Sequence, residues 1–418
     1  MKQLFLLLLF VFPLVGKSQI IPVARTSIMR PIEPPRKTTS RFTETVGKTV
    51  VATKYVAGLD YNTYSRRLVN SANQGNAKAQ FALWYLYYHG QGVNVNDEMA
   101  VKYLQMAANK KIAPALHQLG VCYLDGIGVK ADKKLAAKCF EQSAAKGDMN
   151  AQTYLAWCYL NGIGVMENRP KAMHLYKIAA DKGNAIAQCA MGLAYKAGTD
   201  IPYDKNKSLK YFLLSAKQGD AQAQYELASI YLNESTLENK TKAFEYFKKS
   251  ADNGFEPALV GVGECYILGI GTSVNYYKAY EYFKKSAETG DGYGMFGCYV
   301  CLKAGKGTNV DVDEAWRYLN KSVSVGNCFA MHYLACAYFE GEGVTQNYNL
   351  AFKLFSDAAN GGCFFSYEYM GICYEAGLGV GKNDAKAIMW FEKASKFPLK
   401  DQDAIIKHLE ILKKQLYD

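Results

Sequence analysis

Cysteine can take part in more kinds of chemistry than the other residues in this chain, because its thiolate can bind a metal, attack an electrophile or form a disulfide. Eleven cysteines occur in 418 residues. Equivalent points in stacked helices lie about 8–10 Å apart, whereas a disulfide needs Cα atoms about 4.4–6.8 Å apart. We therefore interpret as small core residues the five that share one position of a period of about 36 residues: Cys122, Cys158, Cys265, Cys301 and Cys373.

The other cysteine patterns suggest little further chemistry. Cys298 and Cys301 form a C-x-x-C pair, but the surrounding pattern predicts a helix, and no second ligand pair lies nearby. Zinc binding or redox chemistry there is therefore not expected. Cys328, Cys336 and Cys363 are clustered enough for one disulfide. The sequence predicts no metal site.

Catalytic motifs are missing from this sequence. The five histidines do not form His-Glu-x-x-His, and neither Gly-x-Ser-x-Gly nor a phosphate-binding Gly-x-x-x-x-Gly-Lys-Ser/Thr occurs. Asp311, Asp313 and Glu314 resemble a calcium cluster, but they open a predicted helix, where acidic side chains suit the helix dipole. We predict that the chain is not an enzyme and has no cofactor. The alternative of a hydrolase would need a convergent catalytic set that we do not find.

The first residues predict export. Residues 1–18 carry Lys2, an apolar run to Val15 and small residues at Gly16 and Ser18, which is typical of a signal peptide cleaved before Gln19. The alternative is an uncleaved membrane anchor, although the run is short for a membrane span. No second apolar stretch of 18 residues follows, so we predict no transmembrane segment. The expected location is the periplasm or the outside of the cell.

Most of the positive charge lies in residues 19–56, which we interpret as a disordered, basic, Pro- and Thr-rich linker. Seven Lys and Arg against two Glu give this segment a net charge of +5, and the rest of the mature chain carries only +4. The linker is either a plain spacer or a tether to an anionic surface. A nearly neutral body argues against nucleic-acid binding.

A repeat of about 36 residues organises the chain from residue 79 onwards. Glycines recur eleven and thirteen residues after a small opening residue, as Gly162 and Gly164 do after Ala151, and Asn or Asp recurs seventeen residues after it. The first glycine suits the left-handed end of a helix, the second a tight reversal, and the Asn or Asp an N-cap. The opening residues are Ala79, Ala115, Ala151, Ala187, Ala223, Ala258, Gly294, Ala330 and Ser366.

Each repeat is thus predicted to be a helix A, a Gly-x-Gly turn, a helix B and a short return. A single repeat cannot bury its apolar face, so neighbouring repeats must stack around one elongated core. We predict an all-α solenoid of about nine repeats over residues 79–396. An N-terminal half-repeat over 57–78 and an amphipathic helix over 397–418 would cap it.

These residues resemble Sel1-like repeats, a relative of the tetratricopeptide repeat. The third repeat carries the resemblance best, with Ala151-Gln152, Leu155, Tyr159, the turn from Asn161 to Val165, Asn168 and Lys171-Ala172. The resemblance covers roughly residues 60–396. It implies a right-handed α-α superhelix and an adaptor or scaffold role.

Repeats four and five depart from the pattern. Asp200-Ile201-Pro202 replaces Gly-Val in repeat four, and repeat five has Glu234 and Thr236 in place of both glycines. Repeats six and seven place Thr272 and Thr308 where Val is usual. These departures indicate either a distinct bend or loop surface, or drift in tolerant loops.

Helical geometry predicts where a partner would bind. At about 100° per residue, positions 2, 3, 6, 9 and 10 after the opening residue face away from the core, and the resemblance implies that they line a concave groove. Aromatic residues there anchor interfaces, although they also suit packing between repeats. The candidate partner-binding residues are Phe81, Tyr85, Tyr88, His117, Tyr154, Trp157, Tyr225, Phe296, Tyr333, Phe339 and Tyr369.

The sequence therefore favours an exported, non-enzymatic scaffold that binds a protein partner through the concave face of the helices A. The alternative is a module that binds a cell-envelope glycan or peptidoglycan through the aromatic stripe, since aromatic rings also stack on sugars.

Overall fold

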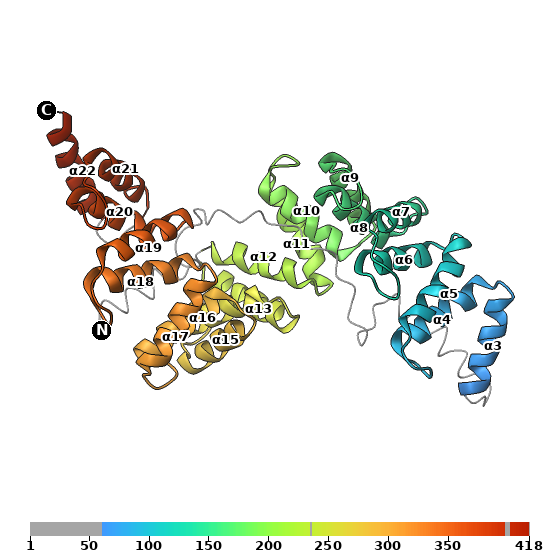
Figure 1. The fold of residues 1–418 in the computed structure, drawn as a ribbon. Helices are drawn as coiled ribbons and strands as arrows, with labels where there is room; N and C mark the ends of the chain where they lie inside the picture. The colour runs from blue at the N-terminus through green and yellow to red at the C-terminus, as the bar shows by residue number, and fades with distance from the viewer. Residues whose placement is uncertain (1–60, 235, 398–401, 418) are drawn as a thin grey trace. The chain divides into compact units, whose positions relative to one another are not determined.

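Helix pairs joined by short turns make up the described part of the molecule (Figure 1). The computed structural model describes residues 61–417 apart from 235 and 398–401, and twenty helices and no strand lie in these residues. The predicted all-α fold of two-helix repeats is confirmed. The helices A are α4 (Ala77–His89), α6 (Ala113–Asp125), α8 (Met149–Asn161), α10 (Ala185–Ala197), α12 (Ala221–Leu232), α14 (Pro257–Leu268), α16 (Gly292–Ala304), α18 (Cys328–Glu340) and α20 (Phe365–Ala376).

Each helix A packs against the helix B that follows it. Within each unit described below, a helix B packs against the next helix A. The helices B are α5 (Asp97–Asn109), α7 (Lys133–Ala144), α9 (Arg169–Asp181), α11 (Lys205–Lys217), α13 (Leu237–Asp252), α15 (Tyr276–Glu288), α17 (Val312–Ser324), α19 (Tyr348–Asn360) and α21 (Asp384–Ala394). The pairs α4–α5 to α20–α21 are repeats one to nine.

Two compact units divide the chain, and the boundary between residues 223 and 224 falls within α12 of repeat five. One unit contains repeats one to four, and the other contains the remainder of the repeats. Helix α3 (Tyr61–Asn73) packs on α4, and α22 (Gln402–Tyr417) packs on α21. Both helices lie where the sequence predicts end caps. The predicted signal peptide (1–18) and linker (19–56) lie outside the described residues.

The turn between the two helices follows the predicted chemistry. In repeat three, Gly162 ends α8 with φ +67°, and its N–H donates to the Cys158 carbonyl. The Asn168 side chain then accepts a hydrogen bond from the Lys171 N–H at 3.0 Å and caps α9. A left-handed glycine and an Asn cap therefore end one helix and begin the next.

The second turn glycine has a role that the sequence did not reveal. A Cβ placed on Gly164 would lie 1.9 Å from the carbonyl oxygen of Lys133, the first residue of helix B in the preceding repeat. In the same way, a Cβ placed on Gly307 would lie 2.0 Å from the carbonyl oxygen of Tyr276. The glycine is therefore required by direct backbone contact between repeats as well as by the tight reversal.

A bulky side chain of each helix B fills the space between helices. Phe212 of α11 is fully buried, and Gly192 of α10 lies so close that an added Cβ would be 2.6 Å from its ring. The two positions are complementary in size, because repeat seven pairs Tyr299 with Leu319 where repeat four pairs Gly192 with Phe212. Where the residue at the Gly192 position of helix A is larger, the residue at the Phe212 position of helix B is thus smaller. This keeps the packed volume constant.

Candidate binding surface

The helices A are more deeply buried than helical geometry predicts. Of the eleven candidate residues, five are buried in the structure: Phe81, Tyr85, His117, Tyr154 and Phe296. The other six are half-buried: Tyr88, Trp157, Tyr225, Tyr333, Phe339 and Tyr369. These side chains therefore contribute to packing, and only the half-buried ones present part of their surface to solvent.

One cause is that aromatic side chains at position 3 of helix A contact aromatic rings of the preceding helix B. Tyr154 of α8 stacks on Phe140 of α7, with ring centroids 4.9 Å apart. Tyr369 of α20 stacks on Phe355 of α19 at 4.6 Å. A helical wheel assumes a single buried face, but α8 and α20 each lie between the helix B of their own repeat and that of the preceding repeat. Positions expected to face a groove therefore meet a second neighbour.

His332 lies at the centre of a buried polar cluster between α18 and α20. Its Nδ1 is 3.0 Å from the Ser366 Oγ, and its Nε2 is 3.6 Å from the Cys336 Sγ. Burial lowers the pKa of His332 to about 3 and raises the pKa of the Cys336 thiol to about 12. An imidazole with so low a pKa is too weak a base to take the proton of a thiol with so high a pKa, so the pair does not form a thiolate nucleophile. The cluster is best explained as a structural network.

The three cysteines that are clustered in the sequence, Cys328, Cys336 and Cys363, make two separate contacts. Cys336 contacts His332, whereas Cys328 and Cys363 are hydrogen-bonded to each other through their thiols. All three are free thiols in the structure. Cys328 is the first residue of α18, and Cys363 lies two residues before the start of α20, the next helix A.

Two glutamates occupy helix A where neighbouring repeats carry apolar or small side chains. Glu264 of α14 is 1% exposed, and its Oε2 has no hydrogen-bond partner among the described residues. Burial raises the pKa of the Glu264 carboxyl well above its ordinary value. Glu226 of α12 is also buried. Neither glutamate is among the residues predicted from the sequence, although an acidic residue within the apolar run from Val260 to Leu268 indicates an unusual position.

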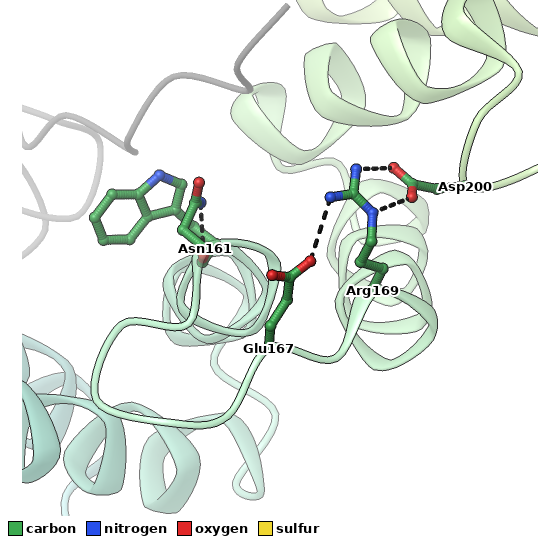
Figure 2. A network of polar contacts seen from close by, with 5 residues as sticks. Asn161, Glu167, Arg169 and Asp200 are labelled. Carbon is green, nitrogen blue, oxygen red and sulfur yellow. Dashed lines mark hydrogen bonds and ion pairs between the residues drawn. The ribbon is translucent and has the colours of Figure 1, made fainter. Parts of the chain in front are cut away.

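The irregular turn of repeat four is held by an ion pair, as Figure 2 shows. Arg169, the first residue of α9, donates from Nε and Nη2 to the two carboxylate oxygens of Asp200, with the Nη2 contact at 3.0 Å. Its Nη1 also contacts Glu167 Oε1 at 3.4 Å. Asp200 occupies the position of the second turn glycine, so a side-chain contact replaces the backbone contact between repeats. The Arg169 side chain is 48% exposed, so the pair contributes at most about 1 kcal/mol.

Neither metal ligands nor a membrane helix is found in the part of the chain that the structure describes. No three His, Cys, Asp or Glu side chains are grouped there so as to hold a metal ion. No described helix combines the length and the apolar character needed to cross a bilayer.

Comparison with known proteins identifies the repeats. The Sel1 repeat profile matches nine stretches of the chain: residues 77–111, 113–148, 150–184, 185–220, 221–255, 257–291, 293–327, 328–363 and 365–396. The chain belongs to the Sel1 repeat family. Such repeats form a helical scaffold that is generally non-catalytic and typical of protein–protein interaction.

Solved structures agree with this assignment. A protective antigen of uropathogenic Escherichia coli strains, displaying an SLR fold, is 26% identical with a TM-score of 0.58. The match covers 80% of this chain and 80% of the antigen. A Sel1 repeat protein from Oxalobacter formigenes is 25% identical with a TM-score of 0.53, over 58% of this chain and 96% of its own. No curated protein matches the chain.

We expect acid to destabilise this Sel1 repeat protein partly through His332. The native pKa of His332 is about 3, whereas an unfolded histidine titrates near 6.5. As the pH falls between these values, the unfolded chain binds a proton that the native chain does not, so stability is lost. Between pH 7 and pH 4, the free energy of unfolding should fall by about 1–3 kcal/mol less in the His332→Gln variant than in wild type. Urea denaturation at the two pH values measures this. The control is the same change at the exposed His174, and equal pH profiles for wild type and H332Q would refute the prediction.

Glu264 should have the opposite pH dependence. Burial raises the pKa of Glu264 in the native state. The contribution of Glu264 to the stability of the fold is therefore complete below the unfolded pKa near 4.3 and is lost as the pH rises. Glu264→Gln keeps the shape and removes the ionisation. We expect it to be more stable than wild type by at least about 1 kcal/mol at pH 8, with a smaller difference at pH 4. Thermal denaturation at both values measures this, and a less stable variant at pH 8 would contradict it.

Proposed function

We propose that this Sel1 repeat protein is an exported, non-enzymatic scaffold that binds a protein partner through the accessible edges of its helices A. The observation that carries the proposal is the incomplete burial of large aromatic side chains on these helices. Trp157 of α8 and Tyr88 of α4 are half-buried, whereas Tyr85 and Tyr154 on the same two helices are buried. Large amphipathic rings held in a packed scaffold are typical interface anchors.

The surrounding packing supports a rigid surface. Tyr88 stacks on Trp84 with ring centroids 5.9 Å apart, and Trp84 is almost completely buried. A ring held in this way loses little conformational entropy on binding. Export rests on the signal-peptide pattern of residues 1–18. A protective antigen among the similar structures is consistent with it.

The experiment is an affinity pull-down from the exported fraction of the source cell with full-length protein. Wild type is compared with the double variant Tyr88→Ala/Trp157→Ala. Both positions lie in the unit formed by repeats one to four and are only half-buried, so we expect helicity to be preserved. The expected result is that at least one protein captured by wild type is lost, because removing two anchors typically costs several kcal/mol of binding.

A matched control changes exposed side chains of the same unit outside helix A. Tyr203 is 65% exposed and Met166 89% exposed, and both lie in turns. The variant Met166→Ala/Tyr203→Ala should keep every partner. If the helix-A variant keeps all partners while its circular dichroism is unchanged, the helix-A face does not bind them and the proposal is wrong.

A further inference from the structure

A hollow of about 650 Å³ lies on α15 beside the turn that follows α16. Helix α15 belongs to repeat six and the turn to repeat seven, both within the unit that follows residue 223. The hollow is lined by Tyr277, Tyr280, Glu281, Lys284, Gly307, Thr308 and Asn309. Its volume is in the range typical of sites for small ligands.

The walls of the hollow are held in place by backbone packing. Gly307 lies so close to α15 that an added Cβ would be 2.0 Å from the Tyr276 carbonyl oxygen. Beside it, the Lys306 Nζ lies 4.7 Å from the centroid of the Tyr276 ring. The turn that carries Thr308 and Asn309 is therefore fixed against the helix that carries the two lining tyrosines. A site of this kind is pre-organised, which lowers the cost of binding.

The lining combines one exposed ring with a rim of polar groups. Tyr277 is 63% exposed, and Tyr280 is half-buried beside it in the lining. Thr308 brings a hydroxyl and Asn309 an amide, each able to donate and to accept hydrogen bonds. Glu281 and Lys284 bring one charge of each sign, so the lining has no net charge to attract an ion.

We propose that this hollow binds a neutral saccharide unit. A pyranose ring presents an apolar C–H face, which stacks on an aromatic ring, and a rim of hydroxyls, which hydrogen-bond to amide, hydroxyl and carboxylate groups. The hollow supplies both kinds of contact side by side. A charge-balanced lining favours a neutral sugar over a phosphate or a carboxylate ligand.

The residues that form the hollow are particular to repeats six and seven. The position of Tyr277 is occupied in other repeats by small, polar or charged residues such as Lys134, Asn206 and Asp313. Thr308 replaces the Val or Ile that most other repeats carry, as Thr272 does in repeat six. Thr272 is not part of the lining, so the two threonines provide a matched pair of test positions.

The test is isothermal titration of the full-length protein with three neutral tetrasaccharides built from N-acetylglucosamine, glucose and mannose. We expect saturable binding of at least one of them with a Kd of about 1 mM or tighter. Tyr277→Ala should weaken that binding at least about tenfold, and Thr308→Val about threefold to tenfold. Thr272→Val should change it less than about twofold.

Three outcomes would overturn the proposal. The first is the absence of binding for all three sugars at about 5 mM, well above the expected Kd. The second is an equal loss of sugar affinity in the Thr272→Val and Thr308→Val variants. The third is binding of inorganic phosphate or of an acidic tetrasaccharide at this hollow in place of the neutral ones. Because Tyr277 lies on a helix B, these results are independent of partner capture by the helix-A face.

Discussion

Gly164→Ala is expected to be among the most destabilising single-methyl additions in this protein, costing about 2–5 kcal/mol. Two effects combine. The residue has φ +70°, a conformation that strains any L side chain, and the new Cβ would lie 1.9 Å from the Lys133 carbonyl oxygen of the preceding repeat. The turn or α7 must therefore shift, which disturbs the contact between repeats two and three. Urea denaturation followed by circular dichroism measures the loss.

Gly162→Ala is the matched control, because it separates backbone strain from the clash. Gly162 has φ +67°, but no atom would lie closer than 3.8 Å to its added Cβ. This variant should pay only the strain of about 1–2 kcal/mol. If the two variants lose the same stability, the second glycine serves the local turn alone, and our explanation of the contact between repeats is wrong.

Phe212→Ala is expected to cost about 3–5 kcal/mol, because it removes a fully buried ring and leaves a cavity between α10 and α11. The adjacent Leu213 is 38% exposed on the same helix. Leu213→Ala should therefore cost less than about 1 kcal/mol. Denaturation midpoints of the two variants compare a core position with a surface position in the same turn of helix.

A double-mutant cycle tests whether the paired positions are complementary in size. Gly192→Ala introduces a Cβ 2.6 Å from the Phe212 ring, which overpacking would penalise by about 1–3 kcal/mol. In a Phe212→Leu background the ring is gone, and the same change should be close to neutral because alanine favours the helix. Additive effects of the two substitutions would show that the positions do not share one space.

The role of the aromatic stripe changes once the neighbours of helix A are known. Residues such as Tyr154 and Phe296 are buried, and substituting them would disturb packing as well as any interface. Trp157 and Tyr88 are better probes because each is only partly covered. The charged and polar residues of α15 form a second, independent surface on the helix-B layer.

Local chemistry was sufficient to predict the repeat, its two helices and its turn. Glycine at the left-handed helix end, Asn or Asp at the N-cap, and small residues where helices meet are requirements of a single repeat. They recur at a fixed spacing, as Gly162, Asn168 and Ala172 do in repeat three. The all-α class, the number of repeats and the family therefore follow from residue types and spacing.

The contacts between repeats were decided only by the tertiary structure. Nothing in the spacing of Gly164 shows that it meets the carbonyl of a residue 31 positions earlier, or that Asp200 replaces this contact with an ion pair to Arg169. The hollow at Tyr277 and Thr308 likewise joins residues of two repeats. Helical periodicity describes one helix against one partner, whereas a helix A that follows another repeat of its unit, such as α8, has the helix B of its own repeat and that of the preceding repeat as neighbours. Burial of the predicted stripe depends on that second neighbour, which no single-helix pattern contains.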